Sequence, residues 1–347
     1  MKKALLPISF LYQMVLECRH ALYDKDFLHS RSFDVPVICV GNLSLGGSGK
    51  TPLTEYLIRL LREMYGVSTL SRGYGRTTKG FAVADSTSSY QDIGDEPLQY
   101  FQKFDGITVA VDEDRCDGIE RLIHNGSTRQ VILLDDAFQH RKVKAGLNIL
   151  LTEFDKPYFN DHLLPAGNLR DVKKAARRAD IIVVTKSPEK LSEEQMQSFL
   201  ERIHPQQDQK VFFSYLRYGD LTPINEYAKT TDASKAVHAV AFCGIANPEP
   251  LFQHLEAKHR HLERIVFGDH HAFSKSDIER IIKAAQKNEG TILITTEKDA
   301  ARLTNNSYFC QFDNIPVFAQ PIEVRFHQEI QFNTEIYNYV RKNIGNR

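Results

Sequence analysis

The chain has 347 residues, which is long enough for two domains with their own hydrophobic cores. Its 44 basic residues balance its 44 acidic residues, so no global positive charge draws it to nucleic acid, and we expect no nucleic-acid partner. The five cysteines are scattered and never form a C-x-x-C pair, which is typical of a reducing compartment and argues against a disulfide framework or a structural zinc site.

The first 30 residues read as a separate unit. An apolar stretch over residues 4–16 follows a basic start, but it is too short to span a bilayer as a helix, and no small-residue cleavage site follows it. A helix from Pro7 would carry a polar stripe and an apolar side, which suits a helix lying in a membrane interface. Packing on its own domain would use the same pattern and remains the alternative. The polar stripe is Ser9, Gln13, Glu17 and His20, and the other side is Ile8, Leu11, Tyr12, Val15 and Leu16.

A glycine-rich segment, residues 41–51, lies between an apolar strand pattern over Val35–Val40 and a helical pattern over Thr51–Met64. Strand, glycine-rich turn and helix are the context of a P-loop, in which backbone amides and the helix N-terminus bind phosphate. Lys50 would reach the terminal phosphates of a nucleotide, and the Thr51 hydroxyl would bind Mg²⁺. The predicted nucleotide-binding residues are Gly46, Gly47, Ser48, Gly49, Lys50 and Thr51.

Two details of sequence refine this prediction. Ser44 stands where the strict P-loop pattern has its first glycine. The run Thr185-Lys186-Ser187-Pro188 resembles a guanine-reading segment, but Pro188 replaces the aspartate that reads the base. We therefore expect ATP, with Mg²⁺, as the cofactor.

Short apolar strands alternate with helical patterns along most of the chain, which indicates an α/β fold with a mostly parallel sheet covered on both faces. We predict a P-loop NTPase-like domain over residues 31–215 and a smaller C-terminal α/β domain over residues 216–347, joined by a polar linker, Tyr218–Ser234. The last helix, Ile330–Ile344, can pack on either domain. The predicted strands are Val35–Val40, Val67–Leu70, Ile107–Val111, Val131–Leu134, Leu147–Leu151 and Ile181–Val184, then Val237–Cys243, Ile265–Phe267, Thr291–Thr295 and Val317–Phe318.

Carboxylates follow several of these segments. Asp135 ends a buried strand, where P-loop NTPases place an aspartate in the Mg²⁺ shell. In Gly94-Asp95-Glu96-Pro97, Asp95 can be a helix cap or a general base that accepts the proton of an attacking hydroxyl. We predict Asp95 as the base, with Thr51 and Asp135 serving the metal. In Asp269-His270-His271, His270 rather than His271 is expected to hydrogen-bond Asp95 across an interdomain cleft.

Arginines occupy loops at the same predicted edge of the sheet. Arg72, Arg115 and Arg170 are the candidates for binding substrate phosphate, because a guanidinium fork matches phosphate oxygens. Asn42, at the end of the strand that precedes the P-loop, is a further candidate for substrate binding.

Taken in order, the motifs resemble those of the tetraacyldisaccharide 4'-kinase family, which phosphorylates the lipid A precursor in Gram-negative bacteria. The resemblance covers almost the whole chain, and Ser44 fits it. Asp171, where the family often has Glu, and Gly268, where it usually has Pro, depart from it, and the role of Asp171 stays open. The matching segments are Leu5-Leu-Pro7, Val40-Gly-Asn42, Ser71-Arg-Gly-Tyr-Gly-Arg76, Gly94-Asp-Glu-Pro97, Asp135-Asp-Ala-Phe-Gln-His-Arg141, Leu164-Pro-Ala-Gly167, Gly244-Ile-Ala-Asn-Pro248, Asp269-His-His271 and Thr296-Glu-Lys-Asp299.

The resemblance implies transfer of the ATP γ-phosphoryl group to the 4'-hydroxyl of a tetraacylated glucosamine disaccharide 1-phosphate. Asp95 would match the catalytic base, His270 its partner, and Lys50 the phosphate-binding lysine. Glu96 would join Thr51 and Asp135 in serving the Mg²⁺. It also implies a peripheral protein on the cytoplasmic face of the bacterial inner membrane. The alternative is a P-loop regulatory or metallochaperone NTPase, in which water attacks the nucleotide and the nucleotide state controls a partner. A membrane-docked scaffold that binds ATP only structurally is a third class.

Overall fold

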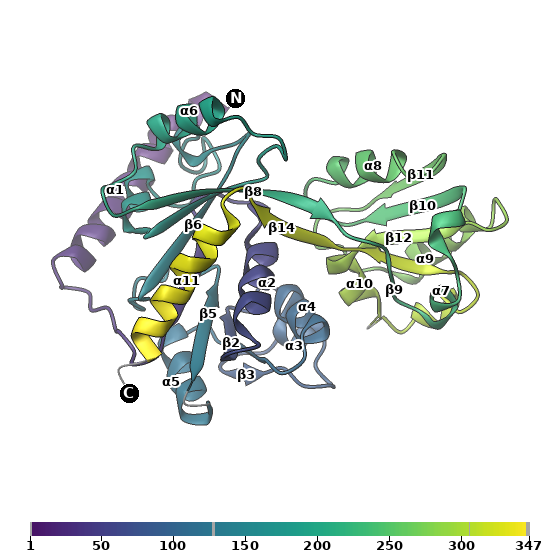
Figure 1. The fold of residues 1–347 in the computed structure, drawn as a ribbon, viewed down its shortest axis with the longest axis horizontal. Helices are drawn as coiled ribbons and strands as arrows, with labels where there is room; N and C mark the ends of the chain where they lie inside the picture. The colour runs from purple at the N-terminus through teal and green to yellow at the C-terminus, as the bar shows by residue number, and fades with distance from the viewer. Residues whose placement is uncertain (1, 127–128, 305, 345–347) are drawn as a thin grey trace.

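The computed structural model describes residues 2–126, 129–304 and 306–344, with the side chains of Lys2 and Lys3 excepted. A nine-stranded sheet and a five-stranded sheet, each with its own helices, form two α/β units that lie beside each other (Figure 1). The strands of the large sheet run in the order β14-β8-β7-β6-β1-β5-β2-β4-β3, and those of the small sheet in the order β11-β10-β12-β13-β9. The predicted α/β class, with a large, mostly parallel sheet and a second smaller sheet, is confirmed.

The large sheet consists of β1 (Val37–Asn42), β2 (Gly66–Ser71), β3 (Ala82–Val83), β4 (Thr108–Val111), β5 (Gln130–Asp135), β6 (Leu147–Glu153), β7 (Ile181–Thr185), β8 (Lys210–Tyr218) and β14 (Ile322–Phe326). Its helices are η1 (Lys2–Leu5), α1 (Leu6–Asp24), α2 (Lys50–Leu61), α3 (Tyr90–Ile93), α4 (Asp95–Lys103), α5 (Arg115–Asn125), η2 (Tyr158–Asn160), η3 (Lys173–Arg178), α6 (Glu193–Ile203) and α11 (Glu329–Ile344).

The small sheet consists of β9 (Thr222–Pro223), β10 (His238–Cys243), β11 (His261–Val266), β12 (Ile292–Thr296) and β13 (Val317–Gln320). Its helices are α7 (Glu226–Lys229), η4 (Ala233–Lys235), α8 (Glu249–Glu256), α9 (Lys275–Ala285), α10 (Glu297–Thr304) and η5 (Phe309–Phe312).

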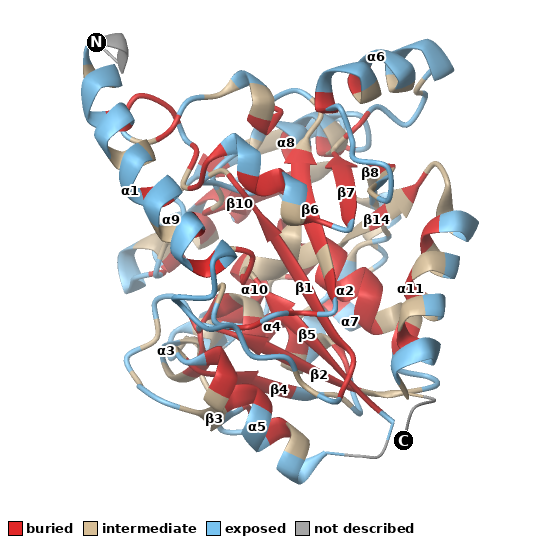
Figure 2. Cartoon of the chain, turned by 90° about the vertical axis from the view of Figure 1, so that its left-hand side faces the viewer, coloured by how far each residue is buried: buried red, intermediate tan, exposed pale blue. Residues whose placement is uncertain are grey.

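The strand order places the phosphate-binding segment at the middle of the large sheet. β1 pairs in parallel with β5 on one side and β6 on the other. Both β1 and β5 are buried along their whole length, as a central parallel strand covered on both faces must be, and they form part of the buried interior in Figure 2. Because parallel strands end at one edge, the loop after β1 and the carboxylates after β5 lie close together, in the place where open α/β sheets bind ligands.

The two sheets are joined by a pair of strands. β8 leaves the large sheet toward the small one, and β14 returns antiparallel to it, with Ile322 opposite Tyr218 (Figure 1). α11 follows β14 and packs on the large sheet, where Phe332, Ile336 and Val340 are fully buried in its core. The segment 322–344 therefore packs with the first domain, although the division at residue 216 itself stays a prediction.

The expected linker Tyr218–Ser234 has a different structure from the one predicted. Tyr218 ends β8, Thr222–Pro223 pairs with β13 of the small sheet, and Glu226–Lys229 forms a helical turn capped by Asn225. Asn225 Nδ2 donates to the carbonyls of Phe312 and Ile315 at 2.9 and 2.8 Å. Such contacts order a polar segment that carries no hydrophobic periodicity of its own, which is why the sequence pattern missed it.

Candidate functional site

The loop between β1 and α2 has the conformation expected of a phosphate cradle. Gly46 and Gly49 adopt φ values of +104° and +88°, which favour glycine, and a Cβ on Gly46 or Gly47 would meet no atom within 4 Å. The base of the loop is fixed by Ser48, whose hydroxyl oxygen accepts from Asn42 Nδ2 at 2.7 Å and whose carbonyl accepts from Thr185 Oγ1 at 2.9 Å. The side of the loop at Gly46 and Gly47 is thus open, and Ser48 fixes the loop to β1 and β7.

Lys50 lies over the carboxyl ends of β1 and β5. Its Nζ is 3.4 Å from Asn42 Oδ1 and 3.8 Å from Asp136 Oδ1. Arg170 forms an ion pair with Asp136 and donates to Asn42 Oδ1 at 2.6 Å. Burial raises the pKa of Asp136, but the hydrogen bond from Arg170 and the charge of Lys50 outweigh it and hold that pKa below its usual range. Two cations and one carboxylate therefore gather beside the cradle.

Asp135 is buried at the end of β5. Its Oδ2 accepts a hydrogen bond from the Tyr100 hydroxyl of α4 at 2.8 Å, while Oδ1 is buried and has no hydrogen-bond partner. Burial, together with the charges of Asp136 and Glu96, raises the pKa of Asp135 to about 6. An unpartnered carboxylate oxygen beside a P-loop is a position that a bound cation would satisfy.

This geometry predicts that Asp135→Asn stabilises the nucleotide-free protein. The folded pKa of about 6 exceeds the ordinary value of 3.8, so the folded state binds more protons between these values, and stability falls as pH rises through that window. Asn removes the buried charge and can still accept from Tyr100. We expect the unfolding free energy at neutral to basic pH to rise by about 1–3 kcal/mol, with no gain in acid. Urea unfolding at several pH values measures this, with Asp105→Asn, an exposed carboxylate, as the control. Equal destabilisation at all pH values would contradict it.

Asp95 begins α4 and contacts the second domain. His270 Nδ1 lies 2.8 Å from Asp95 Oδ2, as predicted for the cleft between the domains, and Arg302 of α10 forms an ion pair with the same oxygen. Burial raises the pKa of Asp95, but the hydrogen bonds with His270 and Arg302 lower it by more, so it lies well below its usual range. His271 instead contacts Asp277 at 3.0 Å. The structure therefore pairs His270, rather than His271, with Asp95.

Arg302, Lys298 and Tyr100 were not among the predicted site residues. Lys298 Nζ lies 2.9 Å from Glu96 Oε1, so Glu96 pairs with a lysine in this structure. The sequence signal for Arg302 and Lys298 was the motif Thr296-Glu-Lys-Asp299, which lies at the start of α10. Tyr100 sits within an ordinary helical pattern, and nothing in the sequence marks its contact with Asp135.

The predicted substrate-binding residues differ in exposure. Arg72 is exposed, whereas Arg115 is buried, donates to the carbonyl of Asp112 at 3.0 Å, and has a buried Nε without a partner. Burial lowers the pKa of Arg115, and the charge of nearby Arg72 lowers it further. Asn42 is buried and engaged with Ser48, Lys50 and Arg170, so in this structure its side chain supports the cradle. A contact of these residues with substrate stays a prediction.

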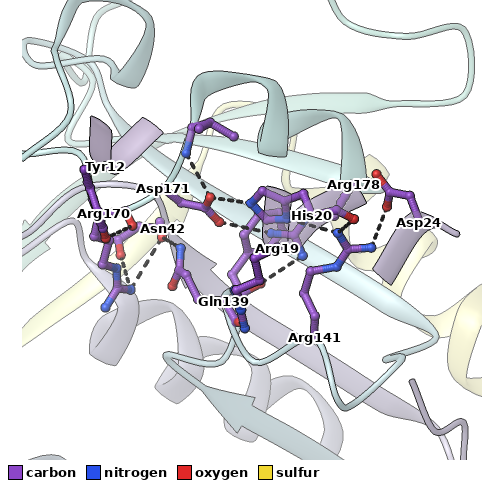
Figure 3. A network of polar contacts seen from close by, with 12 residues as sticks. Tyr12, Arg19, His20, Asp24, Asn42, Gln139, Arg141, Arg170, Asp171 and Arg178 are labelled. Carbon is purple, nitrogen blue, oxygen red and sulfur yellow. Dashed lines mark hydrogen bonds and ion pairs between the residues drawn. The ribbon is translucent and has the colours of Figure 1, made fainter. Parts of the chain in front are cut away.

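Helix α1 reaches this edge of the sheet through polar contacts (Figure 3). The Tyr12 hydroxyl donates to the Arg170 carbonyl at 3.0 Å, and Arg19 donates to the Gln139 carbonyl at 2.9 Å. His20 Nε2 lies 2.6 Å from Asp171 Oδ1. Asp171 is fully buried and also pairs with Arg178, so its contacts in this structure are with α1 and η3. They show a structural role for a residue whose role the sequence left open.

The described part of the chain contains no helix with the length and apolar character needed to cross a bilayer. In those same residues, no group of three or more His, Cys, Asp or Glu side chains forms a metal site by itself. A P-loop metal is bound differently, by one or two protein side chains with phosphate oxygens and waters.

Comparison with known proteins identifies the family. Residues 1–341 match the family described as tetraacyldisaccharide-1-P 4'-kinase. The chain is 44% identical over 345 residues to the tetraacyldisaccharide 4'-kinase of Flavobacterium johnsoniae, covering 99% of this chain and 98% of that one. It is 42% identical over 359 residues to the enzyme of Bacteroides thetaiotaomicron, covering 99% and 94%. A crystal structure of LpxK from Aquifex aeolicus in complex with ATP superposes with a TM-score of 0.76 at 31% identity, covering 98% of this chain and 99% of that chain. This protein belongs to the tetraacyldisaccharide 4'-kinase family of lipid A biosynthesis.

Proposed function

We propose that this kinase binds ATP in the loop between β1 and α2 and transfers its γ-phosphoryl group to the 4'-hydroxyl of a tetraacylated glucosamine disaccharide 1-phosphate. The open face of Gly46 and Gly47 leaves room for phosphate oxygens against backbone amides, and Lys50 lies at the rim. The related Aquifex aeolicus LpxK binds ATP, and its fold matches this chain almost throughout. The family match favours a kinase over the alternative of a regulatory or metallochaperone NTPase.

Mg²⁺ fits the residues present. The buried, unpartnered Oδ1 of Asp135 is an oxygen ligand of the kind Mg²⁺ takes, and Thr51 follows Lys50 in the first turn of α2. Glu96 is close enough for its charge to raise the pKa of Asp135. We assign Asp135 and Thr51 to the metal, with Glu96 joining when Lys298 releases it. When bound, the ion would neutralise charge on the phosphate oxygens.

Asp95 is the proposed general base. Its low pKa keeps it ionised, so it can accept a hydrogen bond from the 4'-hydroxyl and take the proton as the oxygen bonds to phosphorus. Phosphoryl transfer proceeds through a loose transition state, so a base mainly orients the hydroxyl and receives its proton late. Lys50 and the arginines would stabilise the charge on the moving phosphoryl group.

The observation that carries this function is the pairing of Asp95 with His270 across the two domains, beside a P-loop. Incubation with γ-labelled ATP and the purified lipid precursor tests it. Labelled lipid supports the kinase. Labelled inorganic phosphate alone would favour the NTPase, and no turnover would favour the scaffold.

We also propose that α1 docks the enzyme on the membrane. The side of α1 that faces the protein mixes polar and apolar residues: Ser9 Oγ donates to the Leu163 carbonyl at 2.9 Å, Leu16 is buried in the core, and His20 is buried against Asp171. Much of α1 is exposed (Figure 2). Its outward side carries apolar residues, among them Phe10, Leu11 and Val15, which are exposed by 61%, 63% and 65%. A helix that displays a row of apolar side chains to solvent suits a lipid interface. The cytoplasmic face of the inner membrane is the surface where the nucleotide and this lipid would both be accessible.

The outward face gives a prediction. The double variant Leu11→Ser, Val15→Ser should bind anionic vesicles about 10–100-fold more weakly, because each side chain would lose apolar burial in the interface. Its melting temperature should not change, since both side chains are exposed. Sedimentation with vesicles measures binding, and Ile330→Ser, an exposed apolar residue on α11, is the matched control. Equal vesicle binding by the double variant and the wild type would reject α1 as the docking element.

A further inference from the structure

Helix α10 of the second domain lies against α4 of the first, and charged pairs join the two helices. Lys103 of α4 contacts Glu297 at 2.5 Å, Glu96 contacts Lys298 at 2.9 Å, and Asp95 contacts Arg302. The proposed base is therefore held by a helix from the other domain.

Arg302 is a fixed support rather than a mobile surface cation. It is 3% exposed, and its Nη1 donates to Asp299 Oδ1 at 3.1 Å while its Nη2 pairs with Asp95. Asp299 is in turn fully buried and accepts from the Gly244 amide at 2.9 Å and the Thr296 hydroxyl at 2.8 Å. A planar guanidinium anchored on one edge presents its other edge in a defined direction.

The groups around His270 determine which of its ring nitrogens carries the proton. Lys298 Nζ lies 3.4 Å from His270 Nε2, and because an ammonium group can only donate, Nε2 accepts. The ring proton is then on Nδ1, which donates to Asp95 Oδ2. The 3.1 Å approach of Arg302 Nη2 to Nδ1 is a contact between two donors that share Oδ2. Asp269 Oδ2, at 3.9 Å from Nε2, is beyond hydrogen-bonding distance.

We propose that Arg302 is a positioning residue for phosphoryl transfer: it binds Asp95 Oδ2 together with His270 and so leaves Oδ1 to receive the proton of the attacking hydroxyl. The inference rests on the proposed role of Asp95. It also links closure of the domains to catalysis, since the carboxylate reaches this orientation only while α10 lies against α4.

Several charged or titratable groups face Asp95. Arg302 and Lys298 face it from α10, His270 faces it from the loop before α9, and Glu96 is its neighbour on α4. Arg302 contributes both a hydrogen bond and a charge that lower the pKa of Asp95, whereas burial raises it. Without Arg302, His270 alone of these groups would hold Asp95 Oδ2.

Arg302→Gln tests the proposal in the full-length enzyme. Single-turnover transfer should be slower by about 10–100-fold, with unchanged affinity for a non-hydrolysable ATP analogue. Arg302→Lys, which keeps the charge, should restore much of the rate. Glu297→Gln is the matched control, because it breaks an ion pair in the same α4–α10 interface without touching Asp95. An equal loss in Glu297→Gln, or no recovery of the rate in Arg302→Lys, would reduce Arg302 to an interface contact and overturn the proposal.

A measurement without turnover separates this inference from the proposed function. Nitrogen NMR of ¹⁵N-histidine-labelled protein reports which ring nitrogen of His270 carries the proton. The proposal expects the Nδ1-protonated form in the wild type, and an Nε2-protonated ring would overturn it. Should the wild type transfer no phosphate to lipid, the proposed function fails, while the tautomer still decides how Asp95 is oriented.

Discussion

Asp95→Asn is expected to slow phosphoryl transfer by about 10²–10⁴-fold, because an amide cannot accept the proton of the attacking hydroxyl. The side chain keeps its size, and Arg302 keeps its second carboxylate partner, Asp299, so the loss should fall on chemistry rather than on folding. Single-turnover transfer to the lipid precursor measures the rate.

The same variant should still bind ATP, since Asp95 lies on α4 and not in the glycine-rich loop. Affinity for a fluorescent ATP analogue provides this check, and Asp105→Asn is the control for loss of a carboxylate near the end of the same helix. Wild-type rates in Asp95→Asn would remove Asp95 from the mechanism.

Lys50→Ala is expected to lower transfer by about 10²–10³-fold, the loss typical of removing one group that stabilises transition-state charge. ATP affinity should fall as well, because Lys50 would contact the β- and γ-phosphates in the ground state too. Asp136 keeps its pair with Arg170, so the protein should remain folded.

Steady-state kinetics with varied ATP, together with direct nucleotide binding, separates the two effects of Lys50→Ala. Lys79→Ala removes an exposed lysine and should behave as wild type. A Lys50 variant that transfers phosphate normally would show that the loop does not hold the reacting phosphates.

Features carried by short, local patterns could be predicted from the sequence. The glycine-rich segment, the buried strand that ends at Asp135 and the alternation of strands and helices gave the fold class and the position of the cradle, because parallel strands bring their carboxyl ends together. The motif Asp269-His270-His271 also predicted the pairing of Asp95 with His270, and the structure places those side chains 2.8 Å apart. Their catalytic roles remain proposals.

What could not be predicted depends on contacts distant in sequence. β14 joins the large sheet only because β8 lies beside it, and its residues alternate in burial like those of many surface strands. Arg302 contacts Asp95 across 207 positions, and no periodicity marks such a contact. The burial of α1 follows neither predicted stripe, since Ser9 and His20 are buried together with Leu16, whereas Glu17 is exposed together with Leu11. Which residues face the protein depends on partners such as Asp171 and Leu163, which the helix sequence does not contain.

The buried contacts of α1 change how a truncation should be interpreted. Removing the helix would leave the buried carboxylate of Asp171 without His20, and would remove the Tyr12 contact to Arg170, whose side chain binds Asp136. A truncated enzyme could therefore lose activity through its nucleotide site as well as through membrane binding. Substitutions on the exposed face are the cleaner test.

The position of the new phosphate on the lipid product tests the central claim most directly. Two-dimensional proton–phosphorus NMR of the lipid product, made from ATP and the tetraacylated disaccharide 1-phosphate, identifies the oxygen that carries the new phosphate. The account predicts a new phosphomonoester coupled to the 4'-proton beside the original 1-phosphate, formed by the wild type and nearly absent with Asp95→Asn. A product phosphorylated elsewhere, or phosphate found only in water while ATP is consumed, would contradict it.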